Sequence, residues 1–364
     1  MDVIELFKKL LTYRSITPDD DGCLEFLEDY LKDFETLWIN KDGVKNLFLY
    51  KRFGSGEHLC FGGHVDVVPP GDGWDSNPFI PVERDGFIFA RGAQDMKSGV
   101  AAFVQAAKDI KNFNGTLSLL LTSDEEGDAK YGTVLVLKRL KDLNLLPDYA
   151  IVAEPTCESR FGDSIKIGRR GSINGVLEII GKQGHAAYPQ KAINPIDLIA
   201  KILGYISMAK LDNGDDYFEP SRFIITDIRA GMEVTNVTPG KLKMMFNVRN
   251  STKTSINDVE EFIKRYFKNI NYTLKLTQSA KPFITDPDSK IVKLIDSSIQ
   301  KVTKIEPKYS TSGGTSDARF FSEYGVKIVE FGVINDTIHA PNERCSIKEV
   351  ENLYKVFMDL LKSF

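Results

Sequence analysis

Hydrophobic residues alternate between a strand pattern and a helix pattern through the first half of the chain. Strands are predicted where short apolar runs lie between turn residues, and helices where apolar residues recur every three or four positions. The predicted strands are residues 46–50, 58–68, 116–126 and 149–156. The predicted helices are an amphipathic N-terminal segment (apolar Val3, Leu6, Phe7, Leu10 and Leu11), Cys23–Phe34, Lys97–Asn112 and Gly132–Leu143. This alternation predicts an α/β fold with a mostly parallel core sheet.

A different order of elements follows between residues 171 and 283. Strands are predicted at 172–181, 221–230, 241–250 and 271–280, with helices at Pro195–Ala209 and Ile256–Phe267. A turn at Thr238–Gly240 is expected to join the two middle strands. The order β-α-β-β-α-β is typical of a small open-faced, ferredoxin-like sandwich. We therefore predict a domain at 171–283, inserted between catalytic segments 1–170 and 284–364.

The last part of the chain returns to the α/β pattern. A helix is predicted at Ser289–Val302, a strand at 326–332 and a final helix at Lys348–Phe364. The sequence shows neither an internal repeat nor a low-complexity tract.

Composition excludes several classes of protein. The 364 residues carry 47 basic and 51 acidic side chains, so the basic excess of a nucleic-acid-binding protein is missing. The four cysteines are scattered without a CxxC pair, which argues against a disulfide framework and a thiolate zinc site. No apolar run is long enough for a membrane span, and the N-terminus lacks the features of a secretory signal. A cytoplasmic location is the expectation.

Acidic residues and histidines recur where the predicted strands end. They are His64, Asp66, Glu125, Glu126, Glu154 and His339, with Asp95 in a turn before a helix. Each alone has an ordinary explanation, such as a solvated strand edge or a helix cap. Together they would meet at the carboxyl ends of the strands, where ligand sites of open α/β sheets gather. Acids packed so closely would repel one another, and one or two divalent metals would neutralise them.

Eight motifs in this order carry a resemblance to a known family. They are GGHVDVVPPGDGW, ARGAQDMKSG, SDEEGDAKYGT, AEPT, GRRGS, QGHAAYP, SGGTSDARF and IHAPNE. They resemble those of the zinc-dependent aminoacylase and carboxypeptidase-like superfamily, over about His64 to Glu343. The resemblance implies a three-layer zinc-hydrolase domain with an inserted dimerisation domain.

The resemblance also implies a role for each matching residue of a centre with two Zn²⁺ ions, for which Co²⁺ can substitute. Asp95 would bridge the two ions, with His64 and Glu154 completing one site and Glu126 and His339 the other. Glu125 would be the general acid/base, and Asp66 would accept the second imidazole N–H of His64. A cis peptide bond is implied at Asp95–Met96.

Three of the motifs, SDEEGDAKYGT, GRRGS and SGGTSDARF, resemble most closely the branch that removes succinyl groups from diaminopimelate. This implies hydrolysis of the amide bond of N-succinyl-L,L-2,6-diaminopimelate to succinate and L,L-diaminopimelate, a step of lysine biosynthesis. A related deacylase or peptidase, such as an acetylornithine deacetylase, is the alternative enzyme. A metal-binding but non-catalytic relative is the alternative of another class, and the presence of Glu125 with all five ligands argues against it.

Residues outside the metal set complete the predicted site. His185 would enter the active site of the partner subunit and hold the oxyanion, which requires a homodimer formed by the inserted domain. The candidate substrate-binding residues are Arg169, Arg170, Ser172, Asn236, Arg249, Gly313, Gly314, Thr315 and Asn335. Gln94, Ala153 and Pro341 depart from the common family pattern and leave the acyl preference open. His58 matches no motif and is interpreted as a loop or strand-start residue.

Overall fold

The computed structural model describes residues 1–364, and its contacts divide the chain into two compact units. Unit 1 comprises Met1–Gly168, Ile284–Ser310 and Ser316–Phe364, and unit 2 comprises Arg169–Phe283 and Thr311–Thr315. The chain passes between the units near two short strands, β9 (Gly168–Arg169) and β16 (Phe283–Ile284). The segment 311–315, which the sequence placed with the catalytic part, lies with unit 2 instead. The reason is local, because the Arg169 guanidinium donates to the carbonyls of Ser312 and Gly314 at 3.3 and 3.4 Å.

An eight-stranded mixed sheet forms the centre of unit 1. Its order is β1-β2-β6-β3-β7-β18-β8-β17. The bounds are β1 (Glu35–Trp38), β2 (Asn46–Arg52), β6 (Thr116–Thr122), β3 (His58–His64), β7 (Tyr149–Val152), β18 (Lys327–Glu330), β8 (Ser164–Lys166) and β17 (Lys308–Ser310). The four central strands, β6, β3, β7 and β18, run parallel, whereas β2 pairs with β6 and β1 with β2 in antiparallel fashion. The predicted parallel core is confirmed.

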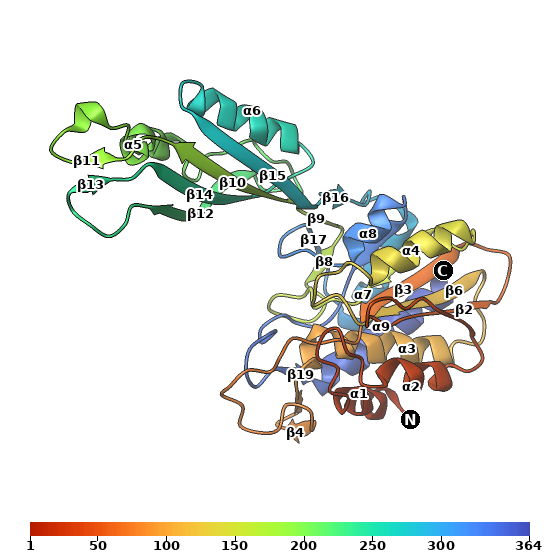
Figure 1. The fold of residues 1–364 in the computed structure, drawn as a ribbon. Coiled ribbons are helices and arrows are strands. Elements are labelled where there is room, and N and C mark those ends of the chain that lie inside the picture. Colours follow the sequence, from red (N-terminus) through yellow and green to blue (C-terminus); the bar gives the residue numbers. More distant parts are fainter. The chain divides into compact units, whose positions relative to one another are not determined.

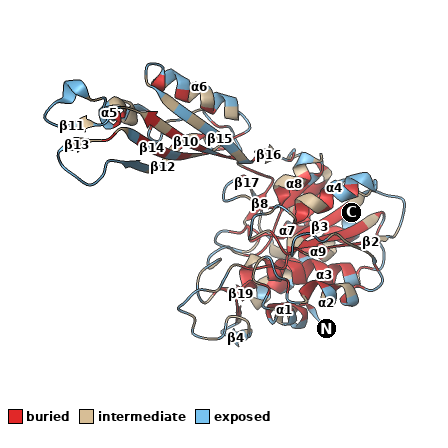
Figure 2. Ribbon diagram, in the orientation of Figure 1, coloured by how far each residue is buried: buried red, intermediate tan, exposed pale blue.

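Helices cover both faces of this sheet and make three layers (Figure 1). One face carries α1 (Val3–Leu11), α3 (Ser98–Asp109), α7 (Lys290–Thr303) and α9 (Ile347–Ser363), which pack on one another. The other carries α4 (Thr133–Asp142) and α8 (Ala318–Glu323), while α2 (Cys23–Tyr30) contacts β2. Alternation along β3 separates the faces: a Cβ on Gly62 would meet Phe321 of α8, and one on Gly63 would meet Phe103 of α3. The buried residues concentrate along these layers (Figure 2).

Unit 1 contains two smaller elements beside the main sheet. A three-stranded sheet joins β4 (Val82–Arg84), β5 (Phe87–Phe89) and β19 (Arg344–Ser346). A short π-helical turn, η1 (Ala93–Lys97), precedes α3 and contains the cis peptide bond Asp95–Met96, as the resemblance implied.

Unit 2 is an antiparallel sheet with two helices on one face. The sheet order is β12-β14-β10-β15. Its elements are β10 (Ser172–Ile180), α5 (Pro195–Ile206), β12 (Arg222–Ala230), β14 (Lys241–Arg249), α6 (Ile256–Phe267) and β15 (Tyr272–Ala280). Inward residues of β14, such as Met244 and Phe246, are buried against the helices, whereas Lys243 and Met245, which alternate with them, are exposed. This is the half-buried alternation expected of an open-faced sheet.

The connection between β12 and β14 contains a short strand that the sequence did not predict. Residues 231–236 and a short strand, β13 (Val237–Thr238), precede β14, and β13 pairs with β11 (Gly184–His185). A 3₁₀ turn, η2 (Pro189–Lys191), follows β11. The predicted turn at Thr238–Gly240 is therefore only the last part of this connection.

Candidate metal centre

The central parallel strands of unit 1 present histidine and carboxylate groups at their carboxyl ends. His64 is the last residue of β3, Glu154 follows β7 by two residues, and Glu125 and Glu126 follow β6 by three and four. Asp95 comes from the turn η1, and His339 from the loop between β18 and β19. All of these side chains belong to unit 1. Side chains from five separate segments therefore converge at this edge of the sheet.

Asp95 lies between two histidines. Its Oδ1 is 3.2 Å from His64 Nε2, and its Oδ2 is 3.5 Å from His339 Nε2. His64 Nε2 also lies 3.8 Å from Glu154 Oε1 and 4.0 Å from Glu125 Oε2. His339 Nε2 lies 2.9 Å from Glu126 Oε1.

These contacts define two overlapping groups that could hold a metal ion. One consists of His64, Glu125 and Glu154, and the other of His64, Asp95 and Glu126, with the ligand atoms of each group within 4.8 Å of one another. Imidazole nitrogen and carboxylate oxygen suit Zn²⁺ in a hydrolytic site. The residues present therefore fit a divalent metal.

The carboxylates of the cluster are too close for all of them to be ionised without a counter-charge. Burial raises the pKa of Glu125 and of Glu154 well above the usual range, and the neighbouring Asp95 adds to both shifts. Burial alone would lower the pKa of His64, but Asp95 and Asp66 raise it well above its usual value. Hydrogen bonds to Asp95 and Glu126 raise the pKa of His339 to about 10. Excess negative charge of this kind is what a bound cation offsets.

Asp66 supports the cluster differently from the sequence prediction. The Nδ1 of His64 lies 2.9 Å from the main-chain carbonyl oxygen of Asp66, but 3.6 Å from the carboxylate Oδ1. The carboxylate instead accepts the backbone N–H groups of Glu125 and Glu126, at 3.4 and 3.1 Å. Asp66 is fully buried, and burial raises its pKa to about 6. It therefore orients the loop after β6 as well as the imidazole.

Sequence reasoning missed a buried ion pair beside the cluster. Arg91 Nη1 lies 2.7 Å from Glu343 Oε2, and both residues are 1% exposed. Arg91 lies two residues before the turn η1, which carries Asp95, and Glu343 is the last residue of the loop that carries His339. Each residue lies inside one of the quoted motifs. The sequence did offer a signal: the two motifs that carry Asp95 and His339 must lie close together in a metal site, and one contains an arginine and the other a glutamate. No local pattern joins two residues so far apart in the chain.

The predicted arginines belong to unit 2. Arg169 is buried, and its guanidinium holds the segment 311–315 by donating to the main-chain carbonyls of that segment. Arg170 Nη1 lies 3.9 Å from Glu219 Oε2, and burial together with the charge of Arg170 lowers the pKa of Arg249. Two cations close enough to influence each other suit an acidic ligand. Ser172 accepts a hydrogen bond from Asn247 at 3.0 Å.

The structure brings His185 and Asn236 together in unit 2. The residue after His185, Ala186, donates its N–H to the Asn236 carbonyl at 2.9 Å, beside the β11–β13 pair. The His185 side chain is exposed, and its Nδ1 accepts the N–H of Ala187 at 3.1 Å. Asn335 lies in unit 1, where its side chain donates to the Pro155 carbonyl next to Glu154. Gly313, Gly314 and Thr315 lie in the segment that Arg169 holds.

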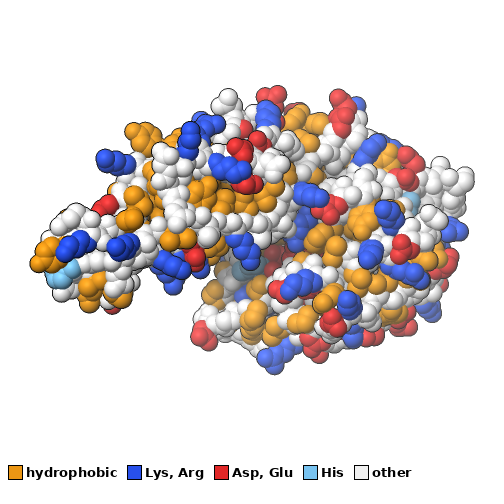
Figure 3. All heavy atoms as spheres, turned by 45° about the horizontal axis from the view of Figure 1, so that its top comes forward, with side chains coloured by type: hydrophobic (Ala, Val, Ile, Leu, Met, Phe, Trp, Pro, Cys, Tyr) orange, Lys and Arg blue, Asp and Glu red, His pale blue; other side chains and the backbone are white.

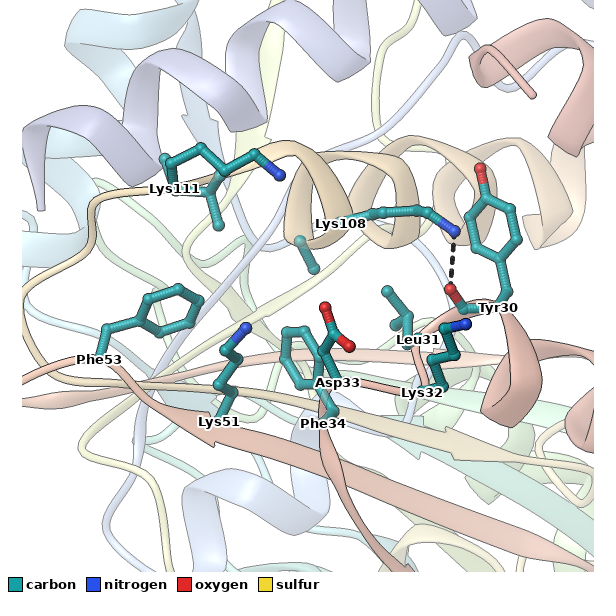
Figure 4. A pocket seen from close by; sticks show the side chains of 11 residues that line it. Tyr30, Leu31, Lys32, Asp33, Phe34, Lys51, Phe53, Lys108 and Lys111 are labelled. Atoms are coloured by element: carbon teal, nitrogen blue, oxygen red, sulfur yellow. Dashed lines mark hydrogen bonds between the residues drawn. The ribbon is translucent and has the colours of Figure 1, made fainter.

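A separate pocket of unit 1 contains none of the predicted site residues. Its lining includes Phe34, Phe53, Lys51, Lys108 and Lys111 (Figure 4). The ammonium group of Lys108 donates to the Tyr30 carbonyl at 2.8 Å and lies over its ring. On the molecular face drawn in Figure 3, basic and acidic side chains are interspersed.

Comparison with known proteins gives a family over most of the chain. The model of peptidase family M20/M25/M40 matches residues 60–363. The succinyl-diaminopimelate desuccinylases of a Nitratiruptor species and of Nautilia profundicola are 71% and 64% identical to the chain, over the full length of both partners.

Solved structures agree on the fold. The aminopeptidase PepT from Bacillus cereus superposes with a TM-score of 0.82 at 20% identity, covering 99% of this chain and 97% of that one. The Bacillus subtilis YXEP protein, described as a dinuclear metal-binding peptidase, superposes with a TM-score of 0.74 at 15% identity, covering 99% and 96%. No helix of this chain combines the length and apolar character that crossing a membrane requires.

Proposed function

The chain belongs to peptidase family M20/M25/M40, and from that premise we propose that it hydrolyses the amide bond of N-succinyl-L,L-2,6-diaminopimelate. The products would be succinate and L,L-diaminopimelate. One observation carries the metal-dependent chemistry: His64, Asp95 and Glu126 place three ligand atoms within 4.8 Å of one another. The acyl specificity is supported by the full-length relatives, which are named succinyl-diaminopimelate desuccinylases.

We assign two Zn²⁺ ions to the cluster, with Asp95 shared between them. His64 and Glu154 would complete one position, and Glu126 and His339 the other. The contacts of Asp95 with both histidines, at 3.2 and 3.5 Å, support its bridging role. Bound zinc would polarise the amide carbonyl and lower the pKa of water.

Glu125 would move the proton. It lies beside His64 in a largely buried position, and burial raises the pKa of its carboxyl group. A carboxylate of this kind accepts a proton from the attacking water and returns it to the leaving amine. Asp66 holds the backbone of Glu125 and thereby orients this side chain.

We further propose a homodimer formed through unit 2, in which His185 of one subunit stabilises the oxyanion in the other. Ten of the fifteen exposed large hydrophobic side chains lie in unit 2, which contains only 120 of the 364 residues. They include Tyr188, Ile193 and Ile196, which follow His185 closely. An apolar surface of this kind favours association. The exposed His185 is free to reach a ligand outside its own unit.

Binding of the substrate carboxylates is assigned to the cationic part of unit 2. Arg170 Nη1 lies 3.9 Å from Oε2 of the largely exposed Glu219. Burial and the positive charge of Arg170 together lower the pKa of Arg249, so the two guanidinium groups are near each other. Guanidinium groups pair well with carboxylates. Arg169, Ser172, Asn236, Asn335 and the segment Gly313–Thr315 would complete the substrate contacts. A cytoplasmic location is part of the same proposal.

Parallel assays with succinylated diaminopimelate and acetylornithine test the function. We expect kcat/KM to be at least tenfold higher with the succinylated substrate, and activity to be lost on chelation and restored by Zn²⁺. A preference for acetylornithine would favour the deacetylase alternative. Metal binding without turnover of any acylated amino acid would favour a non-catalytic relative.

A further inference from the structure

We propose that the buried pair Arg91–Glu343 couples the two loops that carry ligands of both metal positions, so that both positions weaken together when the pair is broken. The inference rests on the proposed metal centre. It assigns a positioning role to two residues that do not touch the substrate.

Glu343 fixes the turn that carries Asp95. Its carboxylate accepts the backbone N–H groups of Gly92, Gln94 and Asp95 at 3.0, 2.8 and 3.1 Å. Three such bonds from consecutive parts of one turn leave it little freedom to move. Because Asp95 lies between His64 and His339, the Glu343 carboxylate sets the position of the predicted bridging ligand.

Arg91 fixes the loop that carries His339. Its guanidinium donates to the carbonyls of His339 and Ala340 at 3.3 and 3.2 Å, and to that of Pro70 at 3.1 Å. Its Nη1 also donates to Glu343 at 2.7 Å. One guanidinium therefore ties the His339 loop to the carboxylate that holds the Asp95 turn.

Gln94 adds a second link between the same two segments. Its side-chain carbonyl accepts the Thr337 N–H at 2.8 Å, and its amide donates to Asp336. Gln94 stands where a small residue is common in the family. Its side chain lies against residues 336–337 and reinforces the connection between the two loops.

Variants that conserve volume separate positioning from folding. Removing one member of a buried pair leaves an unpaired charge and strongly destabilises the fold, so an alanine substitution would mix lost stability with lost positioning. Glu343→Gln keeps the shape and one acceptor oxygen, and Arg91→Lys keeps the charge but loses the planar fork. Lys290→Met is the matched control, because it breaks an exposed 2.6 Å ion pair with Glu57 elsewhere in unit 1.

The measurement is Zn²⁺ affinity by chelator competition on the full-length protein, with the Co²⁺ absorption spectrum as a report on geometry. We expect the Zn²⁺ affinities of both metal positions to fall about 10- to 100-fold in Glu343→Gln and in Arg91→Lys, as for other residues that support metal ligands. The Co²⁺ spectrum should change in both variants. The control should match the wild type. If Glu343→Gln does not fold, Arg91→Lys alone decides.

Two outcomes would overturn the inference while leaving the proposed function standing. One is affinities within threefold of wild type in a folded variant, and the other is weakening of only one position. Failure of the wild-type protein to bind Zn²⁺ would instead refute the proposed function, and the inference with it.

Discussion

Glu125 and Glu126 are adjacent in the chain but have different partners. Glu126 Oε1 lies 2.9 Å from His339, whereas the carboxylate of Glu125 points toward His64 at 4.0 Å. The two side chains leave one loop whose N–H groups are both held by Asp66. This arrangement allows one glutamate to bind metal while its neighbour moves protons.

Replacing Glu125 with glutamine tests that separation of roles. We expect kcat to fall by about 10²- to 10⁴-fold, because an amide of the same size cannot accept the proton. Zinc content by elemental analysis should stay at the wild-type value. Glu126→Gln is the matched control and should lower zinc content. Near wild-type turnover in Glu125→Gln would show that another group is the acid/base.

His58 contributes to the dependence of stability on pH. It starts β3, as the sequence interpretation allowed, and its Nε2 lies 2.7 Å from Ser118 Oγ. Burial lowers its pKa from 6.5 to about 4 in the folded state. Below pH 6.5 the unfolded chain therefore binds a proton that the folded chain does not, so stability is lost as the pH falls toward 4.

The lowered pKa of His58 is predicted to remove about 3 kcal/mol of unfolding free energy between neutral pH and pH 4. Urea unfolding of wild type and His58→Gln between pH 4 and 7.5 measures it. The free energy of unfolding of the wild type minus that of His58→Gln should be greatest at pH 7.5 and decrease as the pH falls, because only the wild type has the buried imidazole. A difference that does not change with pH would mean that His58 does not titrate in this range.

Not every contact at the residue scale could be predicted from the sequence. The convergence of six side chains was predicted from their positions at or after strand ends, and that of Asp95 from its turn before a helix. The partner of His64 Nδ1 could not be predicted in this way, because β3 ends at His64 and the backbone turns there. Once strand alternation stops, residue spacing no longer tells which group of Asp66 faces the ring. The Arg91–Glu343 pair escaped for a similar reason, since its partners come from distant loops.

The elements that were predicted well have strong local signals. α6 spans Ile256–Phe267 as expected, because Val259, Ile263 and Phe267 recur on one face and a capping box of Ser255 and Asp258 marks its start. The strands β11 and β13 were missed because two residues are too short for a periodic pattern. They exist only through pairing with each other, which is tertiary information.

Two helix glycines should respond in opposite directions to alanine. In α5, a Cβ on Gly204 would meet nothing within 4 Å, so Gly204→Ala should stabilise by about 0.5–1 kcal/mol through helix propensity. In α3, a Cβ on Gly99 would lie 2.4 Å from the Ala153 carbonyl oxygen. That clash outweighs propensity, so Gly99→Ala should destabilise by about 1–3 kcal/mol.

Denaturant unfolding of both variants measures these free energies. Because Ala153 precedes Glu154, Gly99→Ala should also lower zinc affinity, whereas Gly204→Ala should leave it unchanged. A stabilised Gly99→Ala protein would mean that α3 does not approach the end of β7 so closely.

At the scale of the whole molecule, the polypeptide of unit 2 is nearly continuous. Its core comes from the four-stranded sheet and the helices α5 and α6, all between residues 172 and 280. A chain with its own core folds independently in many cases. We therefore expect the fragment 169–283 to give the circular-dichroism spectrum and cooperative melting of a folded domain. A random-coil spectrum would show that this part of unit 2 does not fold on its own.

Mixing two variants tests whether His185 acts in the active site of the other subunit. His185→Ala should lower turnover sharply without removing zinc, because the residue lies in unit 2, away in the chain from every proposed ligand. Mixed with Glu125→Gln, it should form hybrid dimers in which one site has an intact Glu125 and receives an intact His185 from the other subunit. The second site of each hybrid lacks both groups.

Random exchange makes about half of the dimers hybrid, with one of two sites intact, so about a quarter of wild-type activity should return. If His185 served its own subunit, every site in the mixture would lack one group and no activity would return. Because Glu125 and His185 belong to different units, neither substitution disturbs the core around the other. Activity that recovers at the rate of subunit exchange would therefore report shared sites, and not repair of a misfolded chain.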